Sequence, residues 1–321
     1  MMKFVSAFLL TIALLAAPPA QAQLRVPVNA GKIEPVPIAI SPFYPDRPEF
    51  AQFAKDIPDI ITNNLRGSGL FKPVSPGAFI QDPASLQKDG PRFAEWRAIN
   101  APALVTGSVT KAPDGRTRVE FRLWDVYSQK QISGMAYMTT PQNWRRIAHI
   151  ISDDVYKRVT GEDGYFDSRI VYVSETGAAT SRIKRLAIMD QDGANHRYLT
   201  EEGTLVLTPR FSPTAQEITY MSYKNGKPRV YLYNIDSGRQ EVLGDFPGMT
   251  FAPRFSPDGN KIVMSMAAGG NTDIYEMDVR SRKSRKLTDA GGIDTAPSYS
   301  PDGRQIVFES DRGGTQQLYV M

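Results

Sequence analysis

A short run of residues recurs three times near the end of this 321-residue chain. The run begins at Pro209, at Pro253 and at Pro297, so successive copies are 44 residues apart. In one-letter code the copies are PRFSPTA, PRFSPDG and PSYSPDG. A period of about 40–45 residues that is rich in short strands is typical of β-propeller blades. The repeat therefore predicts a propeller in the second half of the chain, and it favours binding over catalysis.

Each copy of the repeat predicts the same order of strands. In the second copy, a short inner strand over 253–256 leads into a Ser-Pro-Asp-Gly turn, whose last three residue types all favour turn conformations. Further strands are predicted over 261–267, 273–279 and 284–288. In the earliest copy Thr214 and Ala215 replace Asp-Gly, so we expect that turn to differ in detail.

The number of repeats predicts an incomplete ring. About three and a half blades are present, and the first blade (170–174, 185–190 and 198–200) has no Phe-Ser-Pro strand ahead of it. A closed propeller needs about 4–8 blades. We therefore expect a C-terminal truncation or an incomplete gene model, in which the lost end supplied the inner strand of the first blade. Such a chain would expose open sheet edges and would be poorly stable.

The N-terminus has the pattern of a secretory signal peptide. Lys3 precedes an apolar run over 4–17, and an Ala-Gln-Ala cleavage motif ends at Ala22. We expect a signal peptide over 1–22 that is cleaved before Gln23; a membrane anchor is the alternative. The chain contains no cysteine, which excludes both a lipoprotein anchor at this site and disulfides. The mature protein is therefore predicted to be exported and not inserted in the membrane.

Residues 23–165 are predicted to form an α/β domain ahead of the propeller, which would span 166–321. Buried or alternating patterns predict strands over 36–40, 103–109, 117–126 and 131–139. Apolar residues at helical spacing predict helices over 50–65, 93–99 and 144–159, the last of them ended by Gly161. Pro58 lies inside the first of these helices, where it should kink the helix or mark a restart.

Nothing in the sequence points to a catalytic site, a metal or a cofactor. His149 and His196 are its only histidines, and we expect both to be structural or exposed. The sequence lacks a Gly-x-Ser-x-Gly elbow, a phosphate-binding loop and a dinucleotide fingerprint. The net charge of +4 is scattered, and the basic run over 280–286 is expected to be a solvated strand edge, not a nucleic-acid site.

The order of these segments resembles the TolB family of the bacterial Tol-Pal system. The match is carried by the three propeller repeats and by residues 104–109, 144, 154–155, 160–161, 274–278 and 287–289. It covers essentially the whole chain, except that the family's last blades are missing. The resemblance implies a six-bladed propeller, a location in the periplasm, no enzymatic activity and a monomeric protein.

The resemblance also implies two partners. In the family, the protein links inner-membrane TolA to Pal, an outer-membrane lipoprotein that binds peptidoglycan. This link maintains outer-membrane integrity and supports invagination of the outer membrane during cell division. The TolA-binding segment would be the mature N-terminal tail, and Pal would bind at the mouth of the propeller channel. The residues that match the tail, hereafter the tail residues, are Leu24, Arg25, Val26, Val28 and Asn29.

Topology places the mouth at the loops that join each fourth strand to the next inner strand, because these loops converge on one face. In this chain they include residues 247–252 and 291–296. Met249, Phe251 and Ile293 are either exposed anchors for a partner or apolar residues that fill the channel. The candidate Pal-binding residues, hereafter the mouth residues, are Met249, Thr250, Phe251, Asp294 and Thr295.

Several alternatives remain open at the level of sequence. The extended tail could add to a partner's sheet edge or form an edge strand of its own domain. The propeller could be the accessory domain of a secreted peptidase or lyase whose catalytic part lies outside this chain, or it could bind a small ligand in its channel. If the tail folds back between the domains when Pal binds, tail release and Pal binding would be reciprocally coupled.

Overall fold

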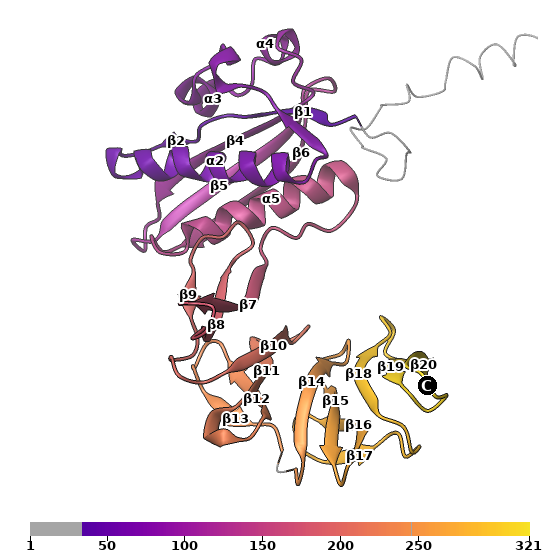
Figure 1. Ribbon diagram of the computed structural model, residues 1–321. Coiled ribbons are helices and arrows are strands. Elements are labelled where there is room, and N and C mark those ends of the chain that lie inside the picture. Colours follow the sequence, from indigo (N-terminus) through magenta and orange to yellow (C-terminus); the bar gives the residue numbers. More distant parts are fainter. Residues whose placement is uncertain (1–33, 245) are drawn as a thin grey trace, which may run out of the picture. The chain divides into compact units, whose positions relative to one another are not determined.

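The computed structural model describes residues 34–244 and 246–321, and it divides the chain into two compact units (Figure 1). The first unit ends at Asp167 and the second begins at Ser168. The predicted signal peptide, its cleavage site and the tail residues lie outside the described residues. Within these ranges, no helix combines the length and the apolar character needed to cross a membrane.

The first unit is built on one mixed sheet with the strand order β3-β1-β4-β5-β6. The two pairings of β1 are parallel, and β4, β5 and β6 form an antiparallel meander. The strands are β1 (Val36–Ile40), β2 (Tyr44–Pro45), β3 (Phe71–Pro73), β4 (Ala103–Lys111), β5 (Thr117–Asp125) and β6 (Lys130–Thr139). The four strands predicted for this unit are confirmed; the short β2 and β3 were not predicted.

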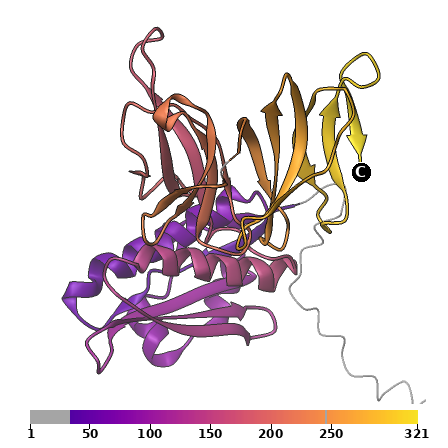
Figure 2. The same cartoon turned by 90° about the horizontal axis from the view of Figure 1, so that it is seen from below.

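Two long helices lie side by side against this sheet (Figure 2). Their apolar side chains and those of one face of the sheet form a single hydrophobic core. They are α2 (Ala51–Gly67) and α5 (Trp144–Thr160). The shorter helices are α3 (Pro83–Asp89) and α4 (Phe93–Ala98), and the buried Trp96 of α4 packs in one hydrophobic cluster with Leu86 of α3. Three short 3-10 helices are η1 (Pro48–Phe50), η2 (Pro76–Ala78) and, in the second unit, η3 (Lys224–Gly226). The predicted end of α5 is confirmed, because Gly161 has the left-handed φ of +85° that suits glycine after a helix.

Pro58 lies inside α2 without interrupting it, so the prediction of a restart at this residue is wrong. Proline has no N–H, which leaves the carbonyl of residue 54 without its usual helical partner. The N–H of Phe43, just before β2, donates to that carbonyl at 2.8 Å. A tertiary hydrogen bond thus replaces the missing helical one, and Pro58 is tolerated in the buried face of the helix.

The second unit consists, within the described residues, of four antiparallel sheets of the propeller type. The first holds β7 (Arg169–Thr176), β8 (Ile183–Asp190) and β9 (Arg197–Tyr198); the second β10 (Val206–Phe211), β11 (Glu217–Ser222), β12 (Arg229–Asn234) and β13 (Gln240–Val242); the third β14 (Met249–Phe255), β15 (Lys261–Ala268), β16 (Asn271–Asp278) and β17 (Ser284–Lys286); the fourth β18 (Asp294–Tyr299), β19 (Ile306–Ser310) and β20 (Gln317–Val320). The predicted fold class, an α/β domain followed by a propeller, is confirmed.

Successive blades pack face to face, and their first strands approach one another. Strands β10 and β14 are in contact, as are β14 and β18, so these are the inner strands of their blades (Figure 2). Buried apolar side chains fill the space between blades; Val230 and Met264, for example, belong to one such cluster, and Ile274 and Phe308 to the next. As predicted, the first blade has no inner strand ahead of β7 among the described residues.

The predicted turn chemistry is present in the last two repeats. The Ser256 hydroxyl donates to the Asp258 carboxylate at 2.6 Å and accepts the Lys261 N–H at 2.9 Å. Ser300 and Asp302 form the same bond at 2.5 Å. The hydrogen bond from Ser256, followed by those from Asn260, lowers the pKa of Asp258 to about 2, because these bonds stabilise its charged form. The aspartates are therefore turn residues, as the sequence indicated.

The turn of the earliest repeat differs, which confirms the expectation for residues 214–215. Because no aspartate is present there, the Ser212 hydroxyl oxygen accepts the N–H groups of both Thr214 and Ala215. The serine alone then closes the turn.

Candidate partner-binding surface

The mouth residues lie on two inner strands of the propeller. Met249, Thr250 and Phe251 are the first residues of β14 and pair with β15, and Asp294 and Thr295 begin β18 and pair with β19. The prediction of a loop up to residue 252 is therefore wrong from Met249 onward, and that of a loop up to residue 296 is wrong from Asp294 onward. The strand begins four residues earlier than predicted, because a bulge accommodates the proline that would otherwise interrupt the ladder.

This bulge recurs at the same position in each inner strand. The pairing register shifts between residues 207 and 210, between 251 and 254, and between 295 and 298. Within each bulge, one residue directly before a proline has a left-handed backbone: Thr208 with a φ of +49°, Ala252 with +50° and Ala296 with +52°. Such a φ is unfavourable for a residue with a Cβ atom, so each inner strand stores backbone strain.

Exposure divides the mouth residues into two groups. Met249 is 40% exposed, and Ile293, which directly precedes Asp294 in the sequence, is 48% exposed. Phe251 and Thr295 are half-buried. Of the two alternatives left open by the sequence, this exposure favours contact with a partner over filling of the channel for Met249 and Ile293. That these side chains bind a partner remains a prediction.

Thr250 is buried and holds two blades together. Its Oγ1 accepts the N–H of Val230 on β12 at 3.1 Å, so it connects the inner strand of the third blade to the second blade. A side chain in this position cannot reach a partner directly. Its contribution to a binding surface would be to fix the position of β14.

Asp294 is likewise buried, and it forms an ion pair within the fourth blade. Its Oδ2 lies 2.9 Å from the guanidinium of Arg312, which also stacks over the rings of Phe308 and Tyr319 at 5.0 and 4.9 Å. Burial raises the pKa of Asp294, but hydrogen bonds from neighbouring hydroxyls and from Arg312 outweigh it, so the pKa lies below its usual value. This carboxylate orders the start of β18.

Two arginines on the inner strands were given no role in the sequence analysis. Arg210 and Arg254 each follow a bulge and occupy the same position in β10 and β14. The signal that could have identified them was present in the sequence, since both lie inside the repeated run and are 44 residues apart.

A cavity of about 210 Å³ opens at the turns of the third and fourth blades. Its lining includes Glu276, which accepts hydrogen bonds from Tyr299 at 3.0 Å and Arg285 at 2.8 Å and lies 3.4 Å from the Lys261 ammonium. Burial, followed by the nearby Glu276 charge, raises the pKa of Tyr299. The glutamate is thus neutralised by two cations, an arrangement that stabilises the blade and leaves it poorly suited to proton transfer. The lining residues are Ser256, Pro257, Asp258, Lys261, Glu276, Tyr299, Asp302 and Gly303.

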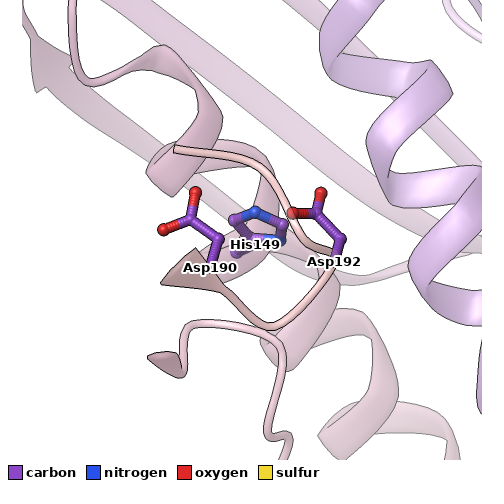
Figure 3. Close-up of side chains that lie close together, drawn as sticks. All are labelled: His149, Asp190 and Asp192. Atoms are coloured by element: carbon purple, nitrogen blue, oxygen red, sulfur yellow. The ribbon is translucent and has the colours of Figure 1, made fainter. Parts of the chain in front are cut away.

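The histidine of the first unit has a structural environment. His149 lies on α5 and is buried (Figure 3). Its Nδ1 lies 2.9 Å from Nδ2 of Asn64 on α2. Figure 3 also labels Asp190, which ends β8 of the second unit and accepts a bond from Asn195, and Asp192 in the turn that follows. Within either unit taken alone, the described residues include no group of three His, Asp or Glu side chains placed to hold a metal ion.

Comparison with known proteins gives one consistent result. A family model of the TolB beta propeller domain matches residues 156–321, and a model of the TolB amino-terminal domain matches residues 24–132. The Tol-Pal system protein TolB of Paramagnetospirillum magneticum is 58% identical over 232 residues, which are 72% of this chain and 52% of that protein. This chain thus spans about half the length of that relative.

A solved structure supports the same assignment. The crystal structure of TolB from Acinetobacter baumannii superposes with a TM-score of 0.76 at 30% sequence identity. The match covers 93% of this chain and 71% of that one, so it includes both units.

Proposed function

The chain belongs to the TolB family, and from this premise we propose that it acts in the Tol-Pal system as a non-enzymatic adaptor in the periplasm. One observation carries the proposal: both halves of the chain match the same family, the first in its amino-terminal domain and the second in its propeller. A propeller alone would not suffice, because unrelated functions share this fold. The combination of the two domains is what makes the assignment specific.

We propose that the two ends of the adaptor engage different partners. The tail residues bind TolA, and the mouth of the propeller binds Pal. For the mouth, support comes from the exposed apolar side chains of Met249 and Ile293, since such side chains anchor protein interfaces when they enter pockets of a partner. Thr250 and Asp294 act indirectly, because both are buried.

An adaptor of this kind connects the two membranes of the cell envelope. TolA in the inner membrane and Pal at the outer membrane would bind the same protein and would thereby be linked to each other. We propose that outer-membrane integrity and invagination of the outer membrane during division depend on this connection. The signal peptide over 1–22 would bring the protein to the required compartment.

Binding measurements on purified proteins test the proposal. The mature chain, a chain lacking residues 23–29, and the variants Met249→Ser and Ile293→Ser would be titrated with the soluble domains of TolA and Pal. A matched control is Val242→Ser, since Val242 is 44% exposed on the outer strand β13. We expect removal of the tail to abolish TolA binding only. Met249→Ser and Ile293→Ser should each weaken Pal binding at least tenfold, whereas Val242→Ser should leave it unchanged.

The opposite outcomes are equally clear. If neither partner binds the mature chain, the adaptor function is wrong. If Pal binds but both mouth variants behave like Val242→Ser, the protein is an adaptor whose Pal site lies elsewhere. Retention of TolA by the chain without its tail would exclude the tail as the TolA-binding segment.

A further inference from the structure

Two arginines lie on neighbouring strands in the innermost layer of the propeller. Arg210 and Arg254 occupy equivalent positions of β10 and β14, and these two inner strands are in contact. The equivalent position in β18 holds Ser298, so two of the three described inner strands carry the arginine. Arg210 is exposed and Arg254 is half-buried.

Both side chains are held in the same way. One nitrogen of the Arg210 guanidinium donates to the carbonyl of the preceding Pro209 at 2.9 Å, and Arg254 donates to the carbonyl of Pro253 at 3.1 Å. Each arginine also directly follows a bulge, a feature that commonly redirects a side chain out of the regular strand pattern. Because a guanidinium carries five N–H donors, most donors of each arginine remain available.

No carboxylate neutralises this pair among residues 34–244 and 246–321, where neither arginine takes part in an ion pair. Other arginines of the same propeller are paired, such as Arg285 with Glu276 and Arg312 with Asp294. Burial and then the charge of Arg210 lower the pKa of Arg254, whereas a nearby carboxylate would raise it. Two like charges thus occupy equivalent positions of contacting strands, and one of them is half-buried.

We propose that Arg210 and Arg254 jointly bind one oxyanion, supplied by the acidic side chain of a polypeptide segment that enters the propeller mouth. An oxyanion between two guanidinium groups relieves their repulsion and can accept paired, charge-assisted hydrogen bonds from both. A polypeptide is favoured over a free small anion because the exposed apolar Met249 lies on the same strand, five residues before Arg254. At about 3.4 Å per residue, an extended segment of five or six residues reaches from one to the other.

The proposal therefore defines the chemistry of the bound segment: an apolar residue followed or preceded, about five positions away, by an aspartate or glutamate. It rests on the proposed function only in assuming that a polypeptide approaches the mouth. The bulges and their strain then have a role, because they hold two arginines in a repulsive arrangement before the ligand arrives.

Fluorescence anisotropy with defined probes tests the proposal on the full chain. One labelled eight-residue peptide carries a leucine and four glutamates, a second carries glutamines in place of the glutamates, and inorganic phosphate is the competitor. The variants are Arg210→Gln and Arg254→Gln. The matched control is Arg304→Gln, which removes the same charge from an exposed turn where Arg304 donates only a backbone N–H to Asp302.

We expect the glutamate peptide to bind the unmodified chain and to bind each of the first two variants at least tenfold more weakly. The control should bind it with unchanged affinity, the glutamine peptide should not bind, and phosphate should compete only at much higher concentration than the peptide. Equal affinities in all three variants would mean general attraction to a basic protein and would overturn the proposal. Binding of phosphate without binding of the peptide would also overturn it, since the anion would then not come from a polypeptide.

Two further measurements separate binding from folding. Arg254→Lys keeps the charge and the aliphatic stem but loses the two-pronged donor geometry, so we expect peptide binding weakened about threefold to tenfold with the fold intact. Without peptide, Arg254→Gln should have an equal or higher melting temperature, because repulsion is removed; a clear decrease would show that Arg254 is structural. If Pal binds the unmodified chain and both arginine variants equally, the inference fails while the adaptor function stands.

Discussion

Replacing Ala252 by glycine should stabilise the propeller. Ala252 has a φ of +50°, where a Cβ atom costs roughly 1–2 kcal/mol. Glycine avoids this cost but loses about 0.5–1 kcal/mol more conformational entropy on folding. The expected net gain in the free energy of unfolding is therefore about 0.5–1 kcal/mol, opposite in sign to the usual effect of a glycine within a strand.

The same reasoning applies to Thr208 and Ala296, which have the same backbone conformation in neighbouring inner strands. Because each strain is local to one backbone residue but the inner strands are in contact, we expect the triple glycine variant to gain up to about 1.5–3 kcal/mol, with full additivity as the upper bound. In a domain of about 150 residues, each kcal/mol raises the melting temperature by about 2–4 °C. The triple variant should therefore melt several degrees higher than the unmodified chain.

The distribution of tryptophans makes this measurable. All three tryptophans, at 96, 124 and 144, lie in the first unit, so tryptophan fluorescence follows that unit while far-ultraviolet circular dichroism follows both. In urea and thermal unfolding, the glycine variants should shift the dichroism transition of the propeller and leave the fluorescence transition unchanged.

The matched control is Ala268→Gly. Ala268 is exposed at the end of β15 and has no positive φ, so this change should destabilise the propeller by about 0.5–1 kcal/mol. If Ala252→Gly lowers stability as much as Ala268→Gly does, the argument from left-handed backbone strain is refuted.

Three further changes have defined outcomes. Gly107→Ala should cost about 1–3 kcal/mol, measured by tryptophan fluorescence in urea, because a Cβ atom at residue 107 would lie 2.7 Å from the Phe43 ring. Asp258 should titrate by NMR with a pKa of about 2. Because this pKa is lowered on folding, the stabilising effect of Asp258 is fully present above its ordinary pKa of 3.8 and is lost as the pH falls through 2. Ser256→Ala should raise this pKa. Asp294→Asn should destabilise the propeller by about 2–3 kcal/mol at neutral pH, since it leaves a partly buried arginine unpaired, and the difference from the unmodified chain should shrink on acidification through the lowered pKa of Asp294.

The blades could be predicted from sequence because their turns are encoded locally. The serine, proline, aspartate and glycine of residues 256–259 each favour the turn by their own backbone or side chain. The start of β14 could not be predicted in this way. Pro253 has no N–H to donate to a neighbouring strand, so sequence rules allow a proline at the first residue of a strand but not inside it. In the structure a bulge contains Pro253, and the regular pairing continues on both sides of it, from Met249 to Phe251 and again from Arg254.

The continuity of α2 illustrates the same limit. A proline inside a helix predicts an interruption, and only the position of the Phe43 N–H against the Ala54 carbonyl removes that penalty. The donor comes from a segment outside the helix, and no periodicity within residues 51–67 contains it. By contrast, α3 could have been predicted, because Asp82 caps its first turn and Pro83 occupies its first position.

The burial of Thr250 and Asp294 was also beyond the sequence. Both belong to segments that the repeat aligns with the start of an inner strand, but which side chain faces a neighbouring blade depends on the register of pairing. Their neighbours Met249 and Ile293 are exposed, so these two side chains are accessible to a partner whereas Thr250 and Asp294 are not.

A repeat protein offers an internal control for separating structural residues from functional ones. The blades share one strand order and one turn, so a residue type that this structure requires should occur in every copy of the repeat. The proline within the bulge does return, at 209, 253 and 297, and so does the left-handed residue before it. The arginine that follows does not, because Ser298 takes its place in the fourth blade while the bulge there is unchanged. The arginine is therefore not needed to build the bulge, and its presence in two of the three described inner strands agrees with the proposed role in binding an oxyanion.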